Sequence, residues 1–242
     1  MPFHFLYSQK TDAGRLRDNN EDTIFIEVPE EPELLKKRGA LFVLADGLGG
    51  MARGEEASRL AVDEMRNFFS HFERLPPASW LHQSIQAVNS RIYNINQNTT
   101  RNHWMATTLT CSLFKANKLT VGHVGDSRIY RVRDGELLCL TQDHASGRHT
   151  LTRAIGTDLK LAVDIYESEL KERDIYIQCS DGLYAYVSEK DLRRTAMGFS
   201  PPESCARLVD LANQSGGGDN ISVQIIQVKK GLGRLELLGP MC

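Results

Sequence analysis

The stretch that decides the fold reads Ala40-Leu-Phe-Val-Leu-Ala-Asp46-Gly-Leu-Gly-Gly50. Six apolar residues lead directly into a carboxylate and a cluster of glycines. An unbroken apolar run of this length predicts a strand that is buried on both faces. The glycines allow a sharp turn and the close approach of another group. Asp46 is therefore expected where a buried strand opens onto a cleft. A carboxylate in that position needs a positively charged partner, because burying an unpaired charge is unfavourable.

The composition is typical of a globular protein. The 242 residues are 41% hydrophobic and 25% charged, with a formal net charge of −2, and this length can support one large core or two modest ones. A nucleic-acid-binding protein usually has a basic excess, so no nucleic-acid partner is expected. No apolar stretch approaches the ~20 residues that span a bilayer, and no signal peptide is recognised. We therefore expect a cytoplasmic protein without a membrane partner.

The five cysteines are widely spaced and include no CxxC pair. Neither a structural zinc site nor a disulfide framework is therefore expected. The simplest interpretation is buried, reduced thiols in a cytoplasmic protein, at Cys111, Cys139, Cys179, Cys205 and Cys242.

Predicted helices and strands occur in separate blocks rather than in alternation, which favours a mainly antiparallel α+β fold. Apolar residues recur on one helical face over 54–72 and over 81–95, and further helices are predicted over 188–197 and from Pro201 onward. Asp134-Gly135 is a strong hairpin signal. Apolar-rich runs predict strands over 3–9, 23–28, 40–45, 106–115, 118–124, 128–132, 136–140, 164–170, 174–179 and 221–228.

The chain is expected to form a single domain over residues 1–242. It contains no internal repeat, no low-complexity tract and no Gly/Ser-rich linker. Residues 29–33 (PEEPE) are expected to form an acidic surface loop. The last segment, 231–242, is apolar enough to pack against the domain, but the sequence assigns it no role.

Acidic residues recur where predicted strands begin or end. Asp46, Asp126 and Asp181 each follow a strand-like run, and Asp219 precedes one. A single Asp-Gly pair is weak evidence, since surface turns contain many. If carboxylates from across the chain converge, however, only cations make that tolerable, and hard divalent ions prefer oxygen ligands. No histidines or cysteines have a paired ligand spacing, which favours magnesium or manganese over zinc.

Five motifs that contain these acidic residues occur in a fixed order. They are Arg17-x-x-Asn20-Glu21-Asp22, Asp46-Gly-x-Gly-Gly50, Gly122-x-x-Gly125-Asp126-Ser127-Arg128, Ser180-Asp181-Gly182 and Gly218-Asp219-Asn220. From about Asp12 to Val228 the chain resembles the metal-dependent protein phosphatases, the protein phosphatase 2C family, and in particular its small stand-alone bacterial members. The resemblance implies two packed antiparallel sheets flanked by helices, with metal ions in a cleft at one edge.

The resemblance also implies roles for the matching residues. Asp46 would bridge two Mn²⁺ or Mg²⁺ ions, and Asp181 and Asp219 would complete one of them. The Glu21-Asp22 pair and the carbonyl of Gly47 would serve the other. Asp126 matches the residue that, with Asp181, holds a third and weaker ion in bacterial members.

Arg17 matches the arginine that binds the substrate phosphate, and a planar guanidinium suits bidentate phosphate binding. Two cations would lower the pKa of a shared water and clamp the phosphate during an in-line displacement. The implied products are free phosphate and a serine or threonine hydroxyl, without a covalent intermediate. The implied partners are phosphorylated proteins, among them a Ser/Thr kinase and its targets, and the enzyme is expected to be a monomer.

Two features depart from the family pattern. Many eukaryotic members carry a histidine after Asp-Gly, where this chain has Leu48, so the general acid stays unassigned. The family also inserts a long flap before the Leu-Thr-Arg-Ala-x-Gly segment, here Leu151–Gly156. In this chain only residues 145–150 separate Gln142-Asp143-His144 from that segment. We therefore expect a more open cleft and a substrate choice that depends less on the flap.

Three alternative interpretations fit the sequence less well. Gly47-Leu-Gly49-Gly-Met-Ala52 nearly matches a dinucleotide-binding fingerprint, but Asp46 would place negative charge beside a pyrophosphate, and alternating βα units are missing. A non-catalytic relative that only binds phosphoproteins would generally lose metal carboxylates, and every matching position is retained here. A calcium-binding domain is disfavoured because no EF-hand spacing occurs.

Overall fold

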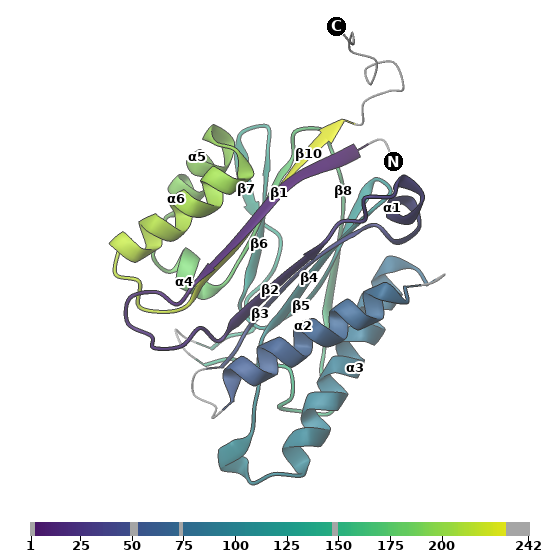
Figure 1. Cartoon of the computed structure of the whole chain (residues 1–242), viewed down its shortest axis with the longest axis vertical. Helices are drawn as coiled ribbons and strands as arrows, with labels where there is room; N and C mark the ends of the chain where they lie inside the picture. Colours follow the sequence, from purple (N-terminus) through teal and green to yellow (C-terminus); the bar gives the residue numbers. More distant parts are fainter. Residues whose placement is uncertain (1–2, 49–52, 73–74, 147–149, 231–242) are drawn as a thin grey trace, which may run out of the picture.

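Two five-stranded antiparallel sheets pack face to face, and helices cover their outer faces (Figure 1). The computed structural model describes residues 3–48, 53–72, 75–146 and 150–230. The first sheet contains, in spatial order, β1 (Phe3–Asp12), β10 (Ile221–Lys230), β9 (Ile175–Cys179), β6 (Arg128–Arg133) and β7 (Glu136–Cys139). The second contains β2 (Asp22–Glu27), β3 (Ala40–Asp46), β4 (Leu109–Lys115), β5 (Lys118–Val124) and β8 (Asp164–Glu169).

β3 lies inside the second sheet, between β2 and β4, and its residues 40–45 are fully buried. The prediction of a strand buried on both faces is therefore confirmed. One face of β3 packs between the sheets, where Phe42 meets Phe114 with ring centroids 5.4 Å apart. The other face packs against helices through Leu41 and Val43. Burying a side chain of this size contributes about 1.5–3 kcal/mol.

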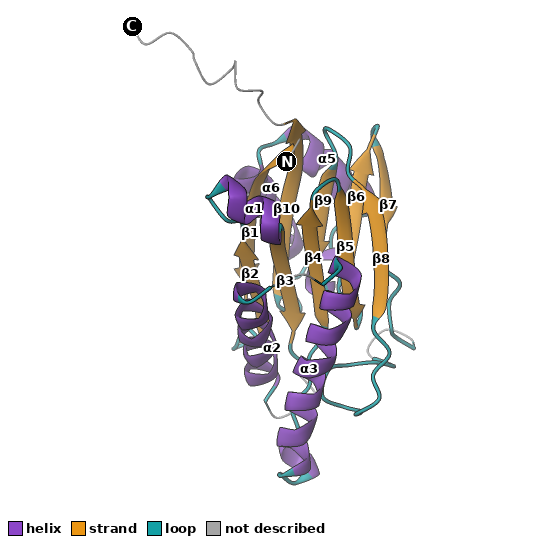
Figure 2. Ribbon diagram, turned by 90° about the vertical axis from the view of Figure 1, so that its right-hand side faces the viewer, coloured by secondary structure: helices purple, strands orange, loops and turns teal. Residues whose placement is uncertain are grey.

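The helices divide between the two sheets, and Figure 2 shows α2 and α3 in front of the second sheet. α2 (Gly54–Ser70) and α3 (Pro77–Gln97) share a core with that sheet, in which the tilted rings of Phe72 and Trp80 lie with their centroids 4.8 Å apart. A 3₁₀ turn (Arg101–His103) follows α3. The first sheet is covered by α4 (Asp181–Tyr184), α5 (Glu189–Gly198) and α6 (Pro201–Gln214).

β1 and β10 pair along their whole lengths, from Phe3 opposite Lys230 to Asp12 opposite Ile221. The first strand predicted over residues 3–9 is therefore three residues longer than expected. The hairpin prediction is confirmed, since Arg133 pairs with Glu136 and both Asp134 and Gly135 have a positive φ.

The prediction of a loop over residues 29–33 was wrong in its second half, because α1 (Pro32–Arg38) begins there. Proline fits the first helical turn. The basic residues 36–38 in the last turn stabilise the helix by interacting favourably with the negative end of its dipole. None of its residues is buried, so no apolar periodicity marked this helix in the sequence.

Four of the five cysteines lie in the described part of the chain and are free thiols, as expected. Three of them are buried, and Cys139 is half-buried. Among the described helices, none is long and apolar enough to cross a membrane. Gly49, Gly50 and the segment 231–242, about which the sequence made predictions, lie outside the described residues.

Candidate active site

The acidic residues picked out in the sequence gather at one end of the two sheets. Asp22 begins β2 and Asp46 ends β3, and the two lie directly opposite each other in the antiparallel register. Asp181 opens α4, immediately after β9 and Ser180. Asp219 stands two residues before β10, the neighbour of β9.

The negative charges of these carboxylates act on one another. The pKa of Asp46 is raised well above its ordinary value, first because its carboxylate loses contact with water. The remaining causes are negative charges from four separate parts of the chain, at Asp22, Asp181, Asp126 and Asp219. The predicted convergence of acidic side chains is therefore present in the structure.

Asp22 is the most deeply buried of these acids, with 7% of its surface exposed. Burial raises its pKa to about 7. The hydroxyl of Ser180 donates to Asp22 Oδ2 at 2.8 Å, but Oδ1 is buried and has no hydrogen-bond partner in the described structure. A buried carboxylate oxygen without a partner costs free energy, so Asp22 is built to receive something that the protein chain alone does not supply.

Arg17 lies at the edge of the carboxylate cluster. Its Nη2 donates to Asp219 Oδ2 at 3.0 Å, and both side chains are partly exposed. This hydrogen bond raises the pKa of Arg17, with further contributions from the charges of Glu21 and Asp181. The predicted phosphate-binding arginine is therefore next to the predicted metal ligands.

Glu21 lies between the segments that carry Asp219 and Asp46. Burial raises its pKa. Its backbone N–H donates to Asn220 Oδ1 at 2.8 Å, and its carbonyl accepts from the N–H of Gly47 at 3.1 Å. Gly47 must be glycine here, since a Cβ would lie 2.4 Å from the carbonyl oxygen of Gly54.

Sequence reasoning gave no role to three polar residues that shape the site. The amide of Asn220 donates to the carbonyls of Ala13 and Asn19 and so holds the loop that carries Arg17. Ser180 donates to Asp22, and the Thr108 hydroxyl accepts from the N–H of Asp46 at 2.9 Å. Asn220 and Ser180 stand inside the quoted motifs, which was a usable signal, whereas Thr108 carried none.

Asp126 approaches the cluster from the turn after β5. Burial raises the pKa of its carboxyl group to about 6. Its own carbonyl accepts a hydrogen bond from the hydroxyl of Tyr184, in α4, at 3.1 Å. The guanidinium of Arg128 stacks 3.8 Å from the centre of the Tyr184 ring and forms a bidentate pair with Asp143.

The donor set fits a magnesium or manganese site. Within 3–48, 53–72, 75–146 and 150–230, no three histidine, cysteine, aspartate or glutamate side chains stand close enough to hold one ion by themselves. Mg²⁺, however, usually binds through one or two carboxylates and keeps several waters. An all-oxygen cluster with raised pKa values and the unpartnered Oδ1 of Asp22 matches that requirement.

Two departures noted in the sequence can be located in part. Leu48 donates its backbone N–H to the carbonyl of Ala106 at 3.0 Å, and its side chain offers no proton. At the short flap, Ala145 bridges to Leu151, and the N–H of Ser146 donates to the carbonyl of Thr150. Residues 147–149 lie outside the described part, so the predicted open cleft stays a prediction.

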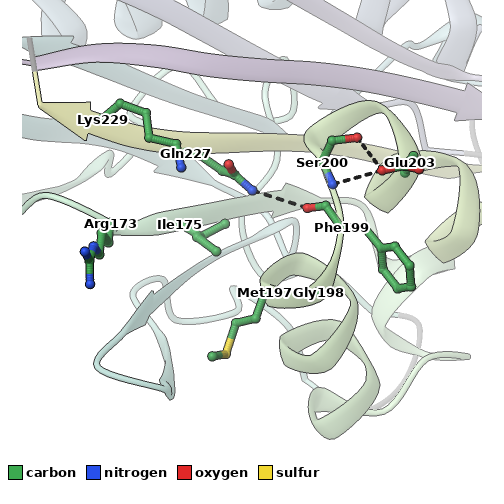
Figure 3. Close-up of a pocket in the computed structure, with 9 residues that line it drawn as sticks. All are labelled: Arg173, Ile175, Met197, Gly198, Phe199, Ser200, Glu203, Gln227 and Lys229. Atoms are coloured by element: carbon green, nitrogen blue, oxygen red, sulfur yellow. Dashed lines mark hydrogen bonds between the residues drawn. The ribbon is translucent and has the colours of Figure 1, made fainter. Parts of the chain in front are cut away.

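A surface pocket of about 450 Å³ lies elsewhere, between the α5–α6 junction and the far ends of β9 and β10 (Figure 3). Arg173, Ile175 and Lys229 line one side of it, and Met197 and Phe199 line the other. The strands β9 and β10 run from this pocket to Asp181 and Asp219. The pocket and the carboxylate cluster are therefore at opposite ends of the first sheet.

The sequence over residues 33–214 matches the family model described as Protein phosphatase 2C. The chain belongs to the protein phosphatase 2C family. The two antiparallel sheets and the strand-end carboxylates are those expected from the resemblance, and the fold is the one that the family's solved structures share. Antiparallel pairing throughout the described strands also argues against a dinucleotide-binding βαβ unit.

Relatives of this phosphatase family are similar over nearly the whole chain. The serine/threonine protein phosphatase PstP of Mycobacterium tuberculosis is 31% identical over 245 residues, which cover 92% of this chain and 45% of PstP. The serine/threonine phosphatase stp of Listeria welshimeri is 28% identical, and the match covers 90% of this chain and 94% of that protein. The chain thus spans about half the length of PstP and nearly all of stp.

A solved structure of the PstP catalytic domain, in complex with two manganese ions, is similar in fold. It superposes with a TM-score of 0.81 at 31% identity and covers 94% of this chain and all of that domain. The structure of a bacterial serine phosphatase gives a TM-score of 0.85 at 25% identity, over 95% of this chain and all of the other. These similarities support the dependence on manganese or magnesium that the family implies.

Proposed function

We propose that this chain is a serine/threonine phosphatase that removes phosphate from proteins with the help of divalent metal ions. The observation that carries the proposal is the position of Asp46, which lies opposite Asp22 at one end of the sheets and whose pKa is raised by burial and by the charges of four other acidic residues. Repulsion among these groups destabilises the fold unless cations compensate it. The family membership of the chain supports the same activity.

The metal ligands that we propose are those implied by the resemblance: Glu21, Asp22, Asp46, the carbonyl of Gly47, Asp126, Asp181 and Asp219. Bound divalent ions would acidify water and neutralise the developing charge on phosphate. The protein supplies the rest of the site. The Thr108 and Ser180 hydroxyls and the Asn220 amide fix the orientation of the backbone and of Asp22 before any ion arrives.

Arg17 is the residue that we propose for phosphate binding. Its guanidinium reaches Asp219 with one nitrogen, and the side chain is 46% exposed. The remaining N–H donors are thus available to a phosphate oxygen from solvent, and Arg–phosphate pairs are stronger than neutral hydrogen bonds. Leu48 offers no proton for the leaving group, so we assign that proton to water.

The finer parts of the proposal concern the setting of the enzyme. We propose a single domain over residues 1–242, acting as a cytoplasmic monomer on the substrates of a Ser/Thr kinase. The short 145–150 segment supports an open cleft that admits protein surfaces rather than only small phosphates.

The test is hydrolysis of an aryl phosphate and of a phosphothreonine peptide by purified protein, with Mn²⁺ and with a chelator. We expect activity only with the metal, and none in Asp46→Asn. Arg173→Glu, in the pocket at the far end of the sheet, is the matched control and should retain full activity. Inactivity of the unmodified protein in excess Mn²⁺ would instead support a phosphoprotein-binding relative without catalysis.

A further inference from the structure

A buried histidine, His144, forms hydrogen bonds with the turn that carries Asp126. His144 is 4% exposed and lies 19 residues along the chain from Gly125. The N–H of Gly125 donates to the Nδ1 of His144 at 3.1 Å, and the N–H of His144 donates to the carbonyl of Gly125 at 2.8 Å. One residue therefore satisfies both backbone polar groups of the glycine that precedes Asp126.

These contacts determine which ring nitrogen carries the proton. Because Gly125 donates to Nδ1, that nitrogen is an acceptor, and the hydrogen of the neutral ring is on Nε2. Nε2 lies 3.1 Å from Asp164 Oδ2 and donates to it. Asp164 is held in turn by Arg153 Nη1 at 2.6 Å and by the Tyr166 hydroxyl at 3.1 Å. The imidazole is thus fixed from the side that faces away from Gly125.

The turn itself has little freedom to adapt. Gly125 has a φ of 111°, and a Cβ there would lie 2.5 Å from the Cβ of Thr108. On its other side, the carbonyl of Asp126 is held by Tyr184. The backbone on the two sides of this turn is therefore held by His144 at Gly125 and by Tyr184 at Asp126. The charge of Asp126 contributes to the raised pKa of Asp46.

We propose that His144 is a positioning residue: its Nδ1 accepts the N–H of Gly125 and so holds the turn that presents the Asp126 carboxylate to the metal site. This inference rests on the proposed function for what Asp126 does there. The ring of His144 also packs against His123, with centroids 4.8 Å apart. The experiment must therefore separate positioning from packing.

Two substitutions divide the contacts of the imidazole between them. In His144→Asn, the amide oxygen can take the place of Nδ1 and accept from Gly125, but the contact with Asp164 is lost. In His144→Gln, the amide nitrogen can take the place of Nε2 and donate to Asp164, but the acceptor for Gly125 is lost. Positioning requires that the Asn variant behaves like the unmodified protein and that the Gln variant does not.

The first readout is the affinity for Mn²⁺, measured by the electron paramagnetic resonance signal of the free ion. Loss of an outer contact that orients a ligand typically weakens metal binding by about 10–100-fold. We expect that weakening at the weakest site in His144→Gln, while the tighter sites and the affinities of His144→Asn stay close to those of the unmodified protein. Equal effects of the two variants would overturn the proposal in favour of packing.

The second readout does not depend on metal or activity. Amide hydrogen exchange of Gly125, measured by NMR in the chelated protein, should be slow in the unmodified protein and in His144→Asn, and at least about tenfold faster in His144→Gln. Equal exchange rates in all three proteins would refute the positioning role. If Gly125 exchange changes as expected but the unmodified protein binds no Mn²⁺, positioning holds and the proposed function fails.

Discussion

Two buried aspartates near opposite ends of β9 differ in how many hydrogen-bond partners their carboxylates have. Asp174, at the start of β9, is 1% exposed and receives both Nε and Nη2 of Arg133 at 2.7 Å, together with the N–H of Lys171 and the hydroxyl of Tyr176. Asp22, beside Ser180 at the other end of that strand, receives one hydroxyl and has an unpartnered oxygen. Paired charge thus stabilises one end of the fold, and at the other end Asp22 keeps a buried oxygen without a partner among the described residues.

At the end of the sheets that carries the carboxylates, we expect the largest loss of activity from Asp46→Asn. Metal ions contribute several kcal/mol of transition-state stabilisation, so we expect roughly a thousandfold loss in kcat or more. The fold should stay intact, because one of the repelling charges is removed. Steady-state kinetics with Mn²⁺ and a thermal melt check both parts, and Asp219→Asn should behave alike. Near-normal rates in both variants would remove these residues from the site.

At the end of the sheet that carries Asp174, we expect a substitution to lower stability and to leave kcat unchanged. Asp174→Ala removes the partner of Arg133, whose side chain is only 18% exposed. Breaking a buried pair on one side costs about 3–5 kcal/mol, which we expect as lost unfolding free energy in urea titrations. The kcat of the folded fraction should not change. Asp22→Asn in the metal-free protein is the comparison, and it should lose no stability; a loss as large as that of Asp174→Ala would contradict the distinction drawn between the two ends.

Arg17 allows a finer division within the carboxylate end. A hydrogen bond to a charged group is worth about 1.5–3 kcal/mol, so Arg17→Ala should raise KM for a phosphopeptide roughly ten- to a hundredfold. kcat should change less, because the metal ligands are retained. Initial rates over a range of peptide concentrations measure the two constants. An unchanged KM would show that the arginine does not bind substrate.

The pH dependence of stability gives the smallest expected signal. In the metal-free protein, burial raises the pKa of Asp22 from 3.8 to about 7. The folded state then holds this proton more tightly than the unfolded state, so the resulting stability is present below about pH 4 and is lost as the pH rises toward 7. Asn cannot ionise, so the Tm of the unmodified protein should fall below that of Asp22→Asn by an amount that grows as the pH rises over this range. Differential scanning calorimetry with a chelator tests this, and a difference that does not grow with pH would contradict it.

The sequence predicted the strands well because their signals are local. The apolar run of β3 and the Asp134-Gly135 turn each determine a structure within a few residues, and both are confirmed. The helix α1 was not predicted, because none of its residues is buried. A helix without an apolar face leaves no periodic pattern to read.

The site was predictable only where its residues stand in motifs. Asp46 and Asp219 could be picked out by their place beside glycines and strands, and family resemblance supplied their order. Thr108 and His144 could not, because their importance lies in contacts with Asp46 and with Gly125 that no local pattern encodes. Only folding brings these pairs together, and their roles emerge from hydrogen bonds rather than from residue type.

The pairing of β1 with β10 has a consequence for biosynthesis. A ribosome completes β1 early and β10 only after more than two hundred further residues, and Arg17 meets Asp219 across 202 positions. Until β10 emerges, the nascent chain lacks a neighbour for β1 and exposes unpaired backbone groups that invite aggregation. The contact between Arg17 and Asp219 can form only once the last strand is made, so this part of the carboxylate cluster is completed at the end of translation.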